Sequence, residues 1–178
     1  MGRSTEKVEL MRTQKSFRGR ILYRRLDRPK KRRQSILEMC KYRPQMNQVE
    51  CHIWHSQIEL INFCHQNKVH VTAYSPLGSS PETFKDTKTN PLNLLEDKRL
   101  AEISKKYKKS VAQILLKFQT TRGVLVIPKS ANVDRMKSNF ELLNWEFEKD
   151  DFEELKSMNY NLRGWTEERV MHSKYFPW

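Results

Sequence analysis

The chain has 178 residues, of which 37% are hydrophobic and 31% charged, and 34 Lys and Arg against 21 Asp and Glu give a net charge of +13. This length fits one domain, and no apolar run approaches the roughly 20 residues of a membrane-spanning helix, so we expect no membrane span. The three cysteines, Cys40, Cys51 and Cys64, form an odd and sparse set, which favours reduced thiols in a cytoplasmic protein.

Most of the excess positive charge lies in residues 1–40. This segment holds 13 Lys and Arg and 4 Asp and Glu, and so carries +9 of the total. Its apolar residues keep no sustained period, and the basic block from Arg28 to Arg33 repels itself, so we predict a disordered or irregular basic leader. A nucleic-acid or nuclear-import patch is one interpretation, but no interleaved aromatic motif or Cys/His finger supports it. An incidental extension is the favoured alternative.

The middle of the chain alternates predicted strands with predicted helices. Residues 46–51 alternate in polarity as a short strand does, and residues 69–74 are rich in β-branched side chains. Between them, residues 57–66 carry an apolar helical stripe, with Ser56 as the expected N-cap. Residues 97–109 repeat apolar positions at spacings of three and four, which predicts a second helix.

The clearest predicted helix begins after Ser110. Ser110 and Gln113 match a capping box, in which each side chain satisfies a backbone N–H group at the start of the helix. Apolar residues follow at helical spacing, and Gly123 suits the positive φ angle with which many helices end. The sequence therefore predicts a helix that ends close to residue 123.

The order of the elements predicts an α/β fold. The apolar run 124–127 predicts a third strand, buried on both faces, and residues 132–143 and 148–158 predict two more helices. Repeated strand–helix units imply parallel strands joined by helical crossovers. In such folds the binding residues gather at the carboxyl ends of the strands. Those ends lie here at residues 50–52, 74–79 and 127–130.

The end of the third predicted strand carries groups that suit a phosphate. Lys129 and Ser130 follow the strand directly, and Arg135 and Asn139 stand four residues apart, on one face of the next helix. A phosphate there would meet an ammonium, a hydroxyl, a guanidinium and the N–H groups of a helix N-terminus. The alternative is a capped loop with surface cations.

Three segments in this order resemble motifs of the aldo-keto reductase family, the NADP-dependent (β/α)8 oxidoreductases. Residues 47–52, Asn-Gln-Val-Glu-Cys-His, are similar to the end of the family's sixth strand, and residues 73–79, Ala-Tyr-Ser-Pro-Leu-Gly-Ser, to its seventh. Residues 127–130, Ile-Pro-Lys-Ser, with the arginine and asparagine that follow, are similar to its eighth-strand cofactor motif. The resemblance implies a partial TIM barrel of about the last three βα units. Residues 41–178 would form this C-terminal portion of the oxidoreductase domain.

The resemblance also implies that the chain binds NADP(H). Gln48 would hydrogen-bond the nicotinamide carboxamide, and Tyr74 would stack against the nicotinamide ring. Lys129, Ser130 and Arg135 would bind the adenosine 2′-phosphate, which favours NADPH over NADH. The other implied cofactor-binding residues lie at the pyrophosphate or the adenine and are Ser75, Pro76, Leu77, Gly78, Ser79, Ala112 and Asn139.

The resemblance does not extend to the family's catalytic residues. Family members reduce aldehydes and ketones to alcohols with an Asp, Tyr, Lys and His set that precedes the sixth strand. No histidine precedes His52 here, and Asp27 is the only aspartate before Asp86. We therefore expect no catalytic residues in this chain, which would be a truncated or fragmentary form without activity on its own.

Other roles follow less directly from the sequence. Trp54 and Phe84 are candidate contacts for a small carbonyl substrate, although Ile53-Trp54 replaces the family's usual Pro-Tyr. The grouping of Cys51, His52 and His55 does not match a zinc framework, so no metal is expected. The family implies a monomer, but three barrel strands leave edges open to self-association. The alternative function is a non-catalytic binding protein that uses the basic leader for nucleic acid or acidic partners.

Overall fold

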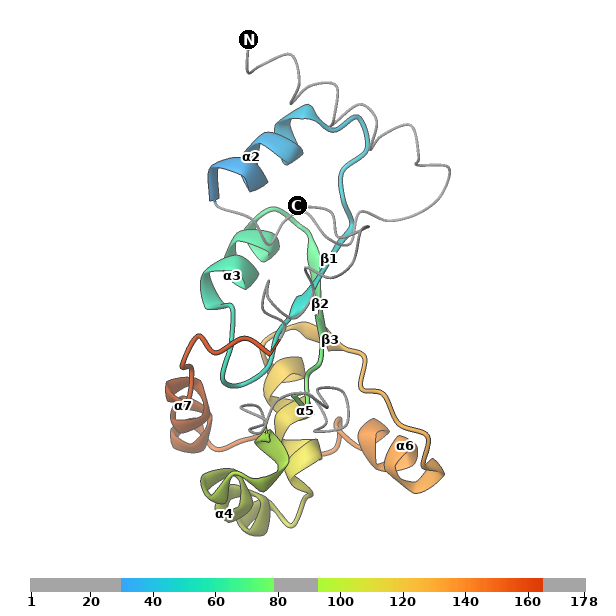
Figure 1. The fold of residues 1–178 in the computed structure, drawn as a ribbon, viewed down its shortest axis with the longest axis vertical. Helices are drawn as coiled ribbons and strands as arrows, with labels where there is room; N and C mark the ends of the chain where they lie inside the picture. The colour runs from blue at the N-terminus through green and yellow to red at the C-terminus, as the bar shows by residue number, and fades with distance from the viewer. Residues whose placement is uncertain (1–29, 79–92, 165–178) are drawn as a thin grey trace.

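The computed structural model describes residues 30–78 and 93–164, and its strands form one parallel three-stranded sheet in the order β1-β2-β3 (Figure 1). This arrangement confirms the predicted α/β class. Among the described residues, β1 and β3 each pair with one strand only, so their outer edges are the edges predicted to be open. The elements are α2 (Lys30–Met39), β1 (Met46–Glu50), α3 (Ile58–Gln66), β2 (His70–Tyr74), η2 (Leu94–Glu96), α4 (Lys98–Tyr107), α5 (Val111–Thr121), β3 (Val124–Val126), α6 (Val133–Phe140) and α7 (Lys149–Ser157).

Helix α3 covers one face of the sheet. Val49 lies opposite Ala73, and Ala73 lies opposite Val126, so these three side chains share a face. The buried side of α3, which includes Leu60 and Cys64, packs on this face and forms the first hydrophobic cluster. The odd-numbered residues of β1 therefore face helix α3. Gln48, and the residue opposite it on β2, point to the other face of the sheet.

A second hydrophobic cluster surrounds α5. Figure 1 shows α4, α5 and α7 gathered at one end of the sheet, and the cluster joins Leu100, Phe118 and Leu155 from these three helices. The capping box predicted at Ser110 and Gln113 is present. The predicted positive φ at Gly123 is also confirmed, with a value of 71°. The helix that sequence analysis predicted best is thus the one at the centre of this core.

Helix α2 was missed by sequence analysis. It lies at the end of the predicted basic leader, and its residue Ile36 is buried in the first hydrophobic cluster, where Leu37 packs beside it. A single apolar pair in a charged stretch gives no repeating period, which is why the pattern did not indicate a helix. The rest of the leader, residues 1–29, lies outside the described residues.

Two local expectations were wrong. Ser56 does not cap α3; the N-cap is Gln57, whose φ of 52° is left-handed and whose side chain makes no capping bond. The backbone N–H of Ser56 instead donates to Asn159 Oδ1 at 3.1 Å. Strand β3 is not buried on both faces, because Leu125 is 49% exposed. Leu125 lies on the face opposite to the one that α3 covers, in the last strand of the sheet, and is covered on one side only.

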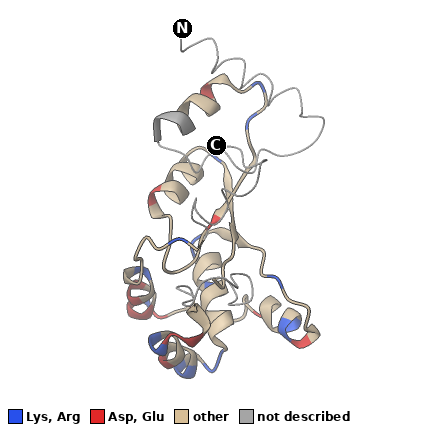
Figure 2. Cartoon of the chain, viewed as in Figure 1, with Lys and Arg blue, Asp and Glu red and all other residues tan. Residues whose placement is uncertain are grey.

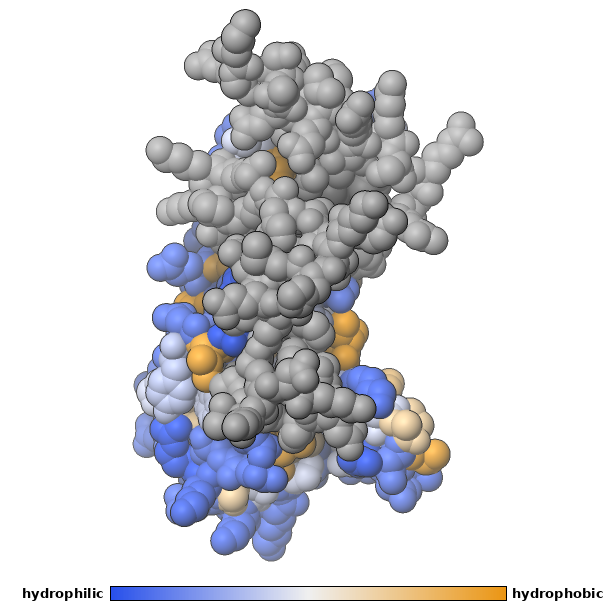
Figure 3. Space-filling view, viewed as in Figure 1, coloured by the Kyte–Doolittle hydropathy of each residue, from blue (hydrophilic) through white to orange (hydrophobic). Residues whose placement is uncertain are grey.

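Helix α6 lies apart from both clusters. None of its residues is buried, and its apolar residues include Met136, 44% exposed, and Phe140, 89% exposed. Figure 3 shows hydrophobic residues beside hydrophilic ones on this helix, and Figure 2 shows that α4, α6 and α7 contain charged residues while the strands contain few. None of the helices among the described residues has the length and apolar character to cross a membrane.

Candidate functional site

The ends of β1 and β2 bring Gln48 and Tyr74 onto one face of the sheet. Gln48 lies opposite Thr72, and Tyr74 is two residues beyond Thr72 on the same strand. Side chains two residues apart share a face, so Gln48 and Tyr74 are diagonal neighbours on the face away from α3. Both are half-exposed, so the two residues predicted to contact a nicotinamide are accessible and adjacent.

The turn after β2 has an unusual backbone. Ser75 has a φ of 51°, Gly78 has a φ of 77°, and the Gly78 N–H donates to the Ser75 carbonyl at 2.9 Å. Pro76 is buried and Leu77 packs on the second hydrophobic cluster, so part of this predicted pyrophosphate loop is anchored in the core. Two predicted residues near this loop, Ser79 and Phe84, lie outside the described residues.

The loop between β3 and α6 is organised by hydrogen bonds. The Ser130 hydroxyl donates to the Asn132 carbonyl and accepts from the Asn132 N–H, both at 3.2 Å. Asn132 caps α6, and its side-chain oxygen accepts from the Arg135 N–H at 2.9 Å. These bonds leave the start of α6 capped by a neutral residue, directly after the loop that carries Lys129.

Lys129 and Arg135 are exposed cations on either side of this cap. Within the described part of the chain, neither side chain forms an ion pair or a hydrogen bond. Some cations of the molecule are paired: Lys117 meets Glu146 at 2.8 Å and Lys106 meets Asp151 at 2.8 Å. Other described lysines, such as Lys137 on α6, form no ion pair. The loop and the first turn of α6 thus offer two cations that form no ion pair within the described residues, although the acidic Asp134 stands next to Arg135 in the chain.

The predicted adenine contacts lie on two helices that touch. The Gln113 side-chain Nε2 donates to the Ser138 carbonyl at 3.1 Å, which joins the first turn of α5 to the last turn of α6. Ala112 precedes Gln113, and Asn139, half-buried, follows Ser138. The structure therefore places these two predicted residues at the two ends of one contact.

Trp54 has a structural role in addition to any contact with a substrate. Its ring packs against the second hydrophobic cluster and lies 6.1 Å from the Tyr160 ring, centroid to centroid. Its carbonyl accepts the N–H groups of Tyr160, at 3.1 Å, and Leu162, at 2.9 Å. The substrate role of Trp54 stays a prediction.

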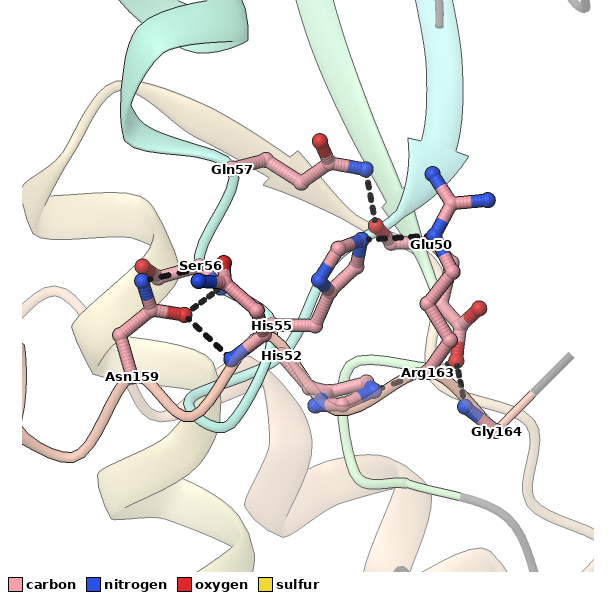
Figure 4. Close-up of polar contacts among 9 residues, drawn as sticks. Glu50, His52, His55, Ser56, Gln57, Asn159, Arg163 and Gly164 are labelled. Atoms are coloured by element: carbon pink, nitrogen blue, oxygen red, sulfur yellow. Dashed lines mark hydrogen bonds and ion pairs between the residues drawn. The ribbon is translucent and has the colours of Figure 1, made fainter. Parts of the chain in front are cut away.

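A buried polar network beyond the end of β1 was missed by sequence analysis (Figure 4). Glu50 Oε1 accepts the Gly164 N–H at 2.6 Å and lies 3.2 Å from His52 Nε2. Arg163 Nε donates to His55 Nε2 at 3.2 Å. Because Gly164 and Arg163 are more than 100 residues from their partners Glu50 and His55, no local pattern could indicate these two bonds. The network fastens residues 159–164 to the end of β1.

Burial changes the acid–base behaviour of two groups near this network. Burial, with the positive charge of Arg163, lowers the pKa of His55 from 6.5 to about 4. Burial raises the pKa of the Cys51 thiol to about 11, and its Sγ donates to Gln119 Oε1 at 3.4 Å. His52 is held by Glu50, and among the described residues no three His, Cys, Asp or Glu form a group that could hold a metal ion. The shifted pKa values keep Cys51 as a thiol and His55 uncharged at neutral pH.

The chain is similar to known proteins over most of its length. The sequence profile of the aldo/keto reductase family matches residues 28–160. Aldo-keto reductase family 1 member D1 of Oryctolagus cuniculus is 41% identical over 124 residues, and family 1 member A1 of Homo sapiens is 40% identical over 128 residues. A crystal structure of MGS-M4, an aldo-keto reductase enzyme from a Medee basin deep-sea metagenome library, superposes with a TM-score of 0.65 at 30% identity.

These matches cover more of this chain than of its relatives. The rabbit protein is matched over 69% of this chain and 37% of its own length, and the human protein over 72% and 39%. The match to the MGS-M4 structure covers 75% of this chain and 47% of the MGS-M4 chain. The chain therefore spans about two fifths of the length of the curated relatives it matches. The profile match begins at residue 28, inside the predicted basic leader.

Proposed function

The chain belongs to the aldo/keto reductase family, and from that premise we propose that it binds NADP(H) at the carboxyl ends of its strands and at the start of α6. The observation that carries this proposal is the pair of exposed cations, Lys129 and Arg135, which have no acidic partner among the described residues and flank a helix N-terminus. Such a group attracts a dianionic phosphate.

The chemistry of this donor set fits the adenosine 2′-phosphate. Lys129 would supply a point charge, Arg135 a planar fork of N–H donors, and Ser130 a hydroxyl. NADH carries no phosphate at this position, so the two cations would add affinity only to NADPH. Charge-assisted hydrogen bonds of this type contribute about 1.5–3 kcal/mol each when they are formed.

The nicotinamide would lie at the other end of the site, beside Gln48 and Tyr74. The Gln48 amide has both a donor and an acceptor for a carboxamide, and the Tyr74 ring offers a flat surface for stacking. When bound, the cofactor supplies a hydride for reduction of a carbonyl carbon. The role of these two residues would be to orient the ring so that one face is open to a substrate.

Reduction of a small aldehyde or ketone is the activity we propose for the whole protein of this family, not for this chain alone. The Asp, Tyr, Lys and His set that resemblance would place before β1 is not recognisable in residues 1–45. We therefore propose that these 178 residues bind cofactor without turning it over. The basic leader as a nucleic-acid contact stays a prediction, because residues 1–29 lie outside the described residues.

The test is a titration of the purified chain with NADPH and NADH, followed by protein fluorescence, with carbonyl-dependent NADPH oxidation assayed in parallel. We expect tighter binding of NADPH, and Lys129→Met to weaken it by about 10- to 100-fold while NADH affinity stays the same. Lys137→Met is the matched control, because it removes an exposed lysine from α6 itself.

Three results would each contradict a part of the proposal. Equal affinity for the two dinucleotides in the wild-type chain would show that no phosphate site exists. An equal loss of NADPH affinity in the Lys129 and Lys137 variants would show that only the net charge matters. Oxidation of NADPH with a carbonyl substrate, at a rate ordinary for an enzyme, would overturn the proposed lack of turnover.

A further inference from the structure

We infer that Gln113 is a positioning residue for the cofactor: its side chain holds α6 against α5 and thereby fixes where Arg135 and Asn139 lie. The inference rests on the proposed function, because it concerns the adenosine end of that same site. It assigns to Gln113 a role beyond the capping box that sequence analysis predicted for it.

Each end of the Gln113 amide has its own partner. The side chain is buried, with 5% exposed, in the first turn of α5. Its Oε1 accepts the Ser110 N–H at 3.0 Å, which is the capping bond. Its Nε2 donates to the Ser138 carbonyl of α6 at 3.1 Å. The cap needs the oxygen alone, so the amide nitrogen is available for the contact between helices.

Few other contacts hold α6 in place. No residue of α6 is buried, and among the described residues the Gln113–Ser138 bond is the only hydrogen bond between α6 and another helix. Lys117 Nζ donates to the Leu142 carbonyl at 2.9 Å and so anchors the chain after the helix. The position of α6 therefore depends on two polar contacts from α5, of which Gln113 makes the one inside the helix.

The anchored carbonyl is close in the helix to the proposed cofactor residues. Ser138 stands three residues after Arg135, on the same face of α6, and directly before Asn139. A rotation or shift of α6 about this point moves both side chains together, because they belong to one rigid helical segment. Loss of the Gln113 contact should therefore weaken the adenosine end and leave the nicotinamide end, on β1 and β2, unchanged.

The decisive variant is Gln113→Glu, which separates the two bonds. A carboxylate still accepts the Ser110 N–H, so the cap remains, but it has no proton to donate to the Ser138 carbonyl. Gln119→Glu is the matched control, since Gln119 is fully buried on the same helix but contacts Cys51 rather than α6. Gln113→Met, of similar length, removes both bonds without adding a buried charge.

We expect Gln113→Glu to weaken NADPH binding by about tenfold and to change NADH affinity less. Hydrogen exchange provides a readout without cofactor: the amides of residues 138–142 should exchange faster in both Gln113 variants than in the wild-type and Gln119→Glu chains. Thermal melting of each variant confirms that the chain is folded before binding is measured. Gln113→Met should reproduce both changes and also lower the melting temperature, because it loses the half of the capping box that the Gln113 side chain supplies to the Ser110 N–H.

The outcomes distinguish this inference from the proposed function. Unchanged exchange of residues 138–142 in both Gln113 variants would show that the bond does not hold α6 and would overturn the inference. Faster exchange with unchanged NADPH affinity would also overturn it, because α6 would then be free to move without effect on the site. Absence of saturable NADPH binding in the wild-type chain would instead overturn the proposed function, and the role of Gln113 toward a cofactor with it.

Discussion

Helices α5 and α6 both begin with a side-chain cap, at Ser110 and Asn132, yet they are held in the molecule by different forces. Most residues of α5 are buried, and three of them belong to the second hydrophobic cluster, whereas no residue of α6 is buried and its position depends on polar contacts. The candidate site includes residues of the sheet and residues of the exposed helix α6. Its nicotinamide end lies on the sheet, and its adenosine end lies on α6, so affinity for the phosphate and stability of the fold should respond to different substitutions.

The largest expected difference between the two helices comes from shortening one phenylalanine in each. Phe118 of α5 is fully buried, and Phe118→Ala should lower the free energy of unfolding by about 3–5 kcal/mol through lost burial and the cavity left behind. Phe140, at the end of α6, is 89% exposed, and Phe140→Ala should change it by less than about 0.5 kcal/mol. Urea unfolding followed by circular dichroism measures both.

A large effect of Phe140→Ala on the free energy of unfolding would contradict the expected difference between α5 and α6. It would show that α6 is packed in solution, against another copy of the chain or against residues outside the described ranges. Repeating the unfolding at several protein concentrations separates these two cases, because the stability of an associated state depends on concentration and that of a monomer does not.

A second difference should be visible in the pH dependence of stability. The pKa of His55 is about 4 in the folded chain, lowered by burial and by Arg163, against 6.5 for an ordinary histidine. Below pH 6.5 the unfolded chain takes up a proton that the folded chain does not bind, so stability should fall as the pH drops toward 4. The loss should be on the order of 2 kcal/mol. The network of Glu50, His52 and Arg163 joins β1 to residues 159–164, so acidification should destabilise the sheet and this segment, and not α6.

The pH effect is measured as the difference between the wild-type chain and His55→Gln, in urea unfolding at pH 7 and pH 4.5. Carboxylates also titrate in this range, but they do so in both chains, so their contributions to the difference in stability largely cancel. The variant should lose less stability on acidification than the wild type. Parallel pH profiles of the two chains would contradict the assignment of this effect to His55.

Residues that act through local patterns were the ones that sequence analysis placed correctly. The capping box at Ser110 and Gln113 and the turn at Gly123 depend on residues within a few positions of each other, and all three are as predicted. The positions of the three strands along the chain were also predicted correctly, since each strand carries its own β-branched or alternating pattern.

Features that depend on distant partners could not be predicted. Ser56 looks like an N-cap, but its N–H is bonded to Asn159, 103 residues away, and α3 begins at a left-handed Gln57 instead. The Glu50–Gly164 bond joins positions 114 residues apart. In the candidate site, the resemblance named Gln48 and Tyr74, and the register of β1 and β2 in the structure shows that they are neighbours. The contact of Gln113 with Ser138 depends on how two helices pack, which no local pattern contains. Pattern predicted the buried face of α5 but not that of β3, and it could not indicate which polar groups meet between distant segments.

The smallest expected effect tests the two helix caps directly. Ser110→Ala removes the acceptor of the Gln113 N–H and should lower the free energy of unfolding by about 1 kcal/mol, because α5 unfolds only together with the core. Asn132→Ala removes the acceptor of the Arg135 N–H, but α6 can fray while the core stays folded, so global stability should change by less than about 0.5 kcal/mol. Hydrogen exchange should show the reverse order, with faster exchange throughout α6 in the Asn132 variant and little change there in the Ser110 variant. Equal global costs for the two substitutions would mean that α6 folds as one unit with the core, and the separation of phosphate affinity from fold stability would then fail.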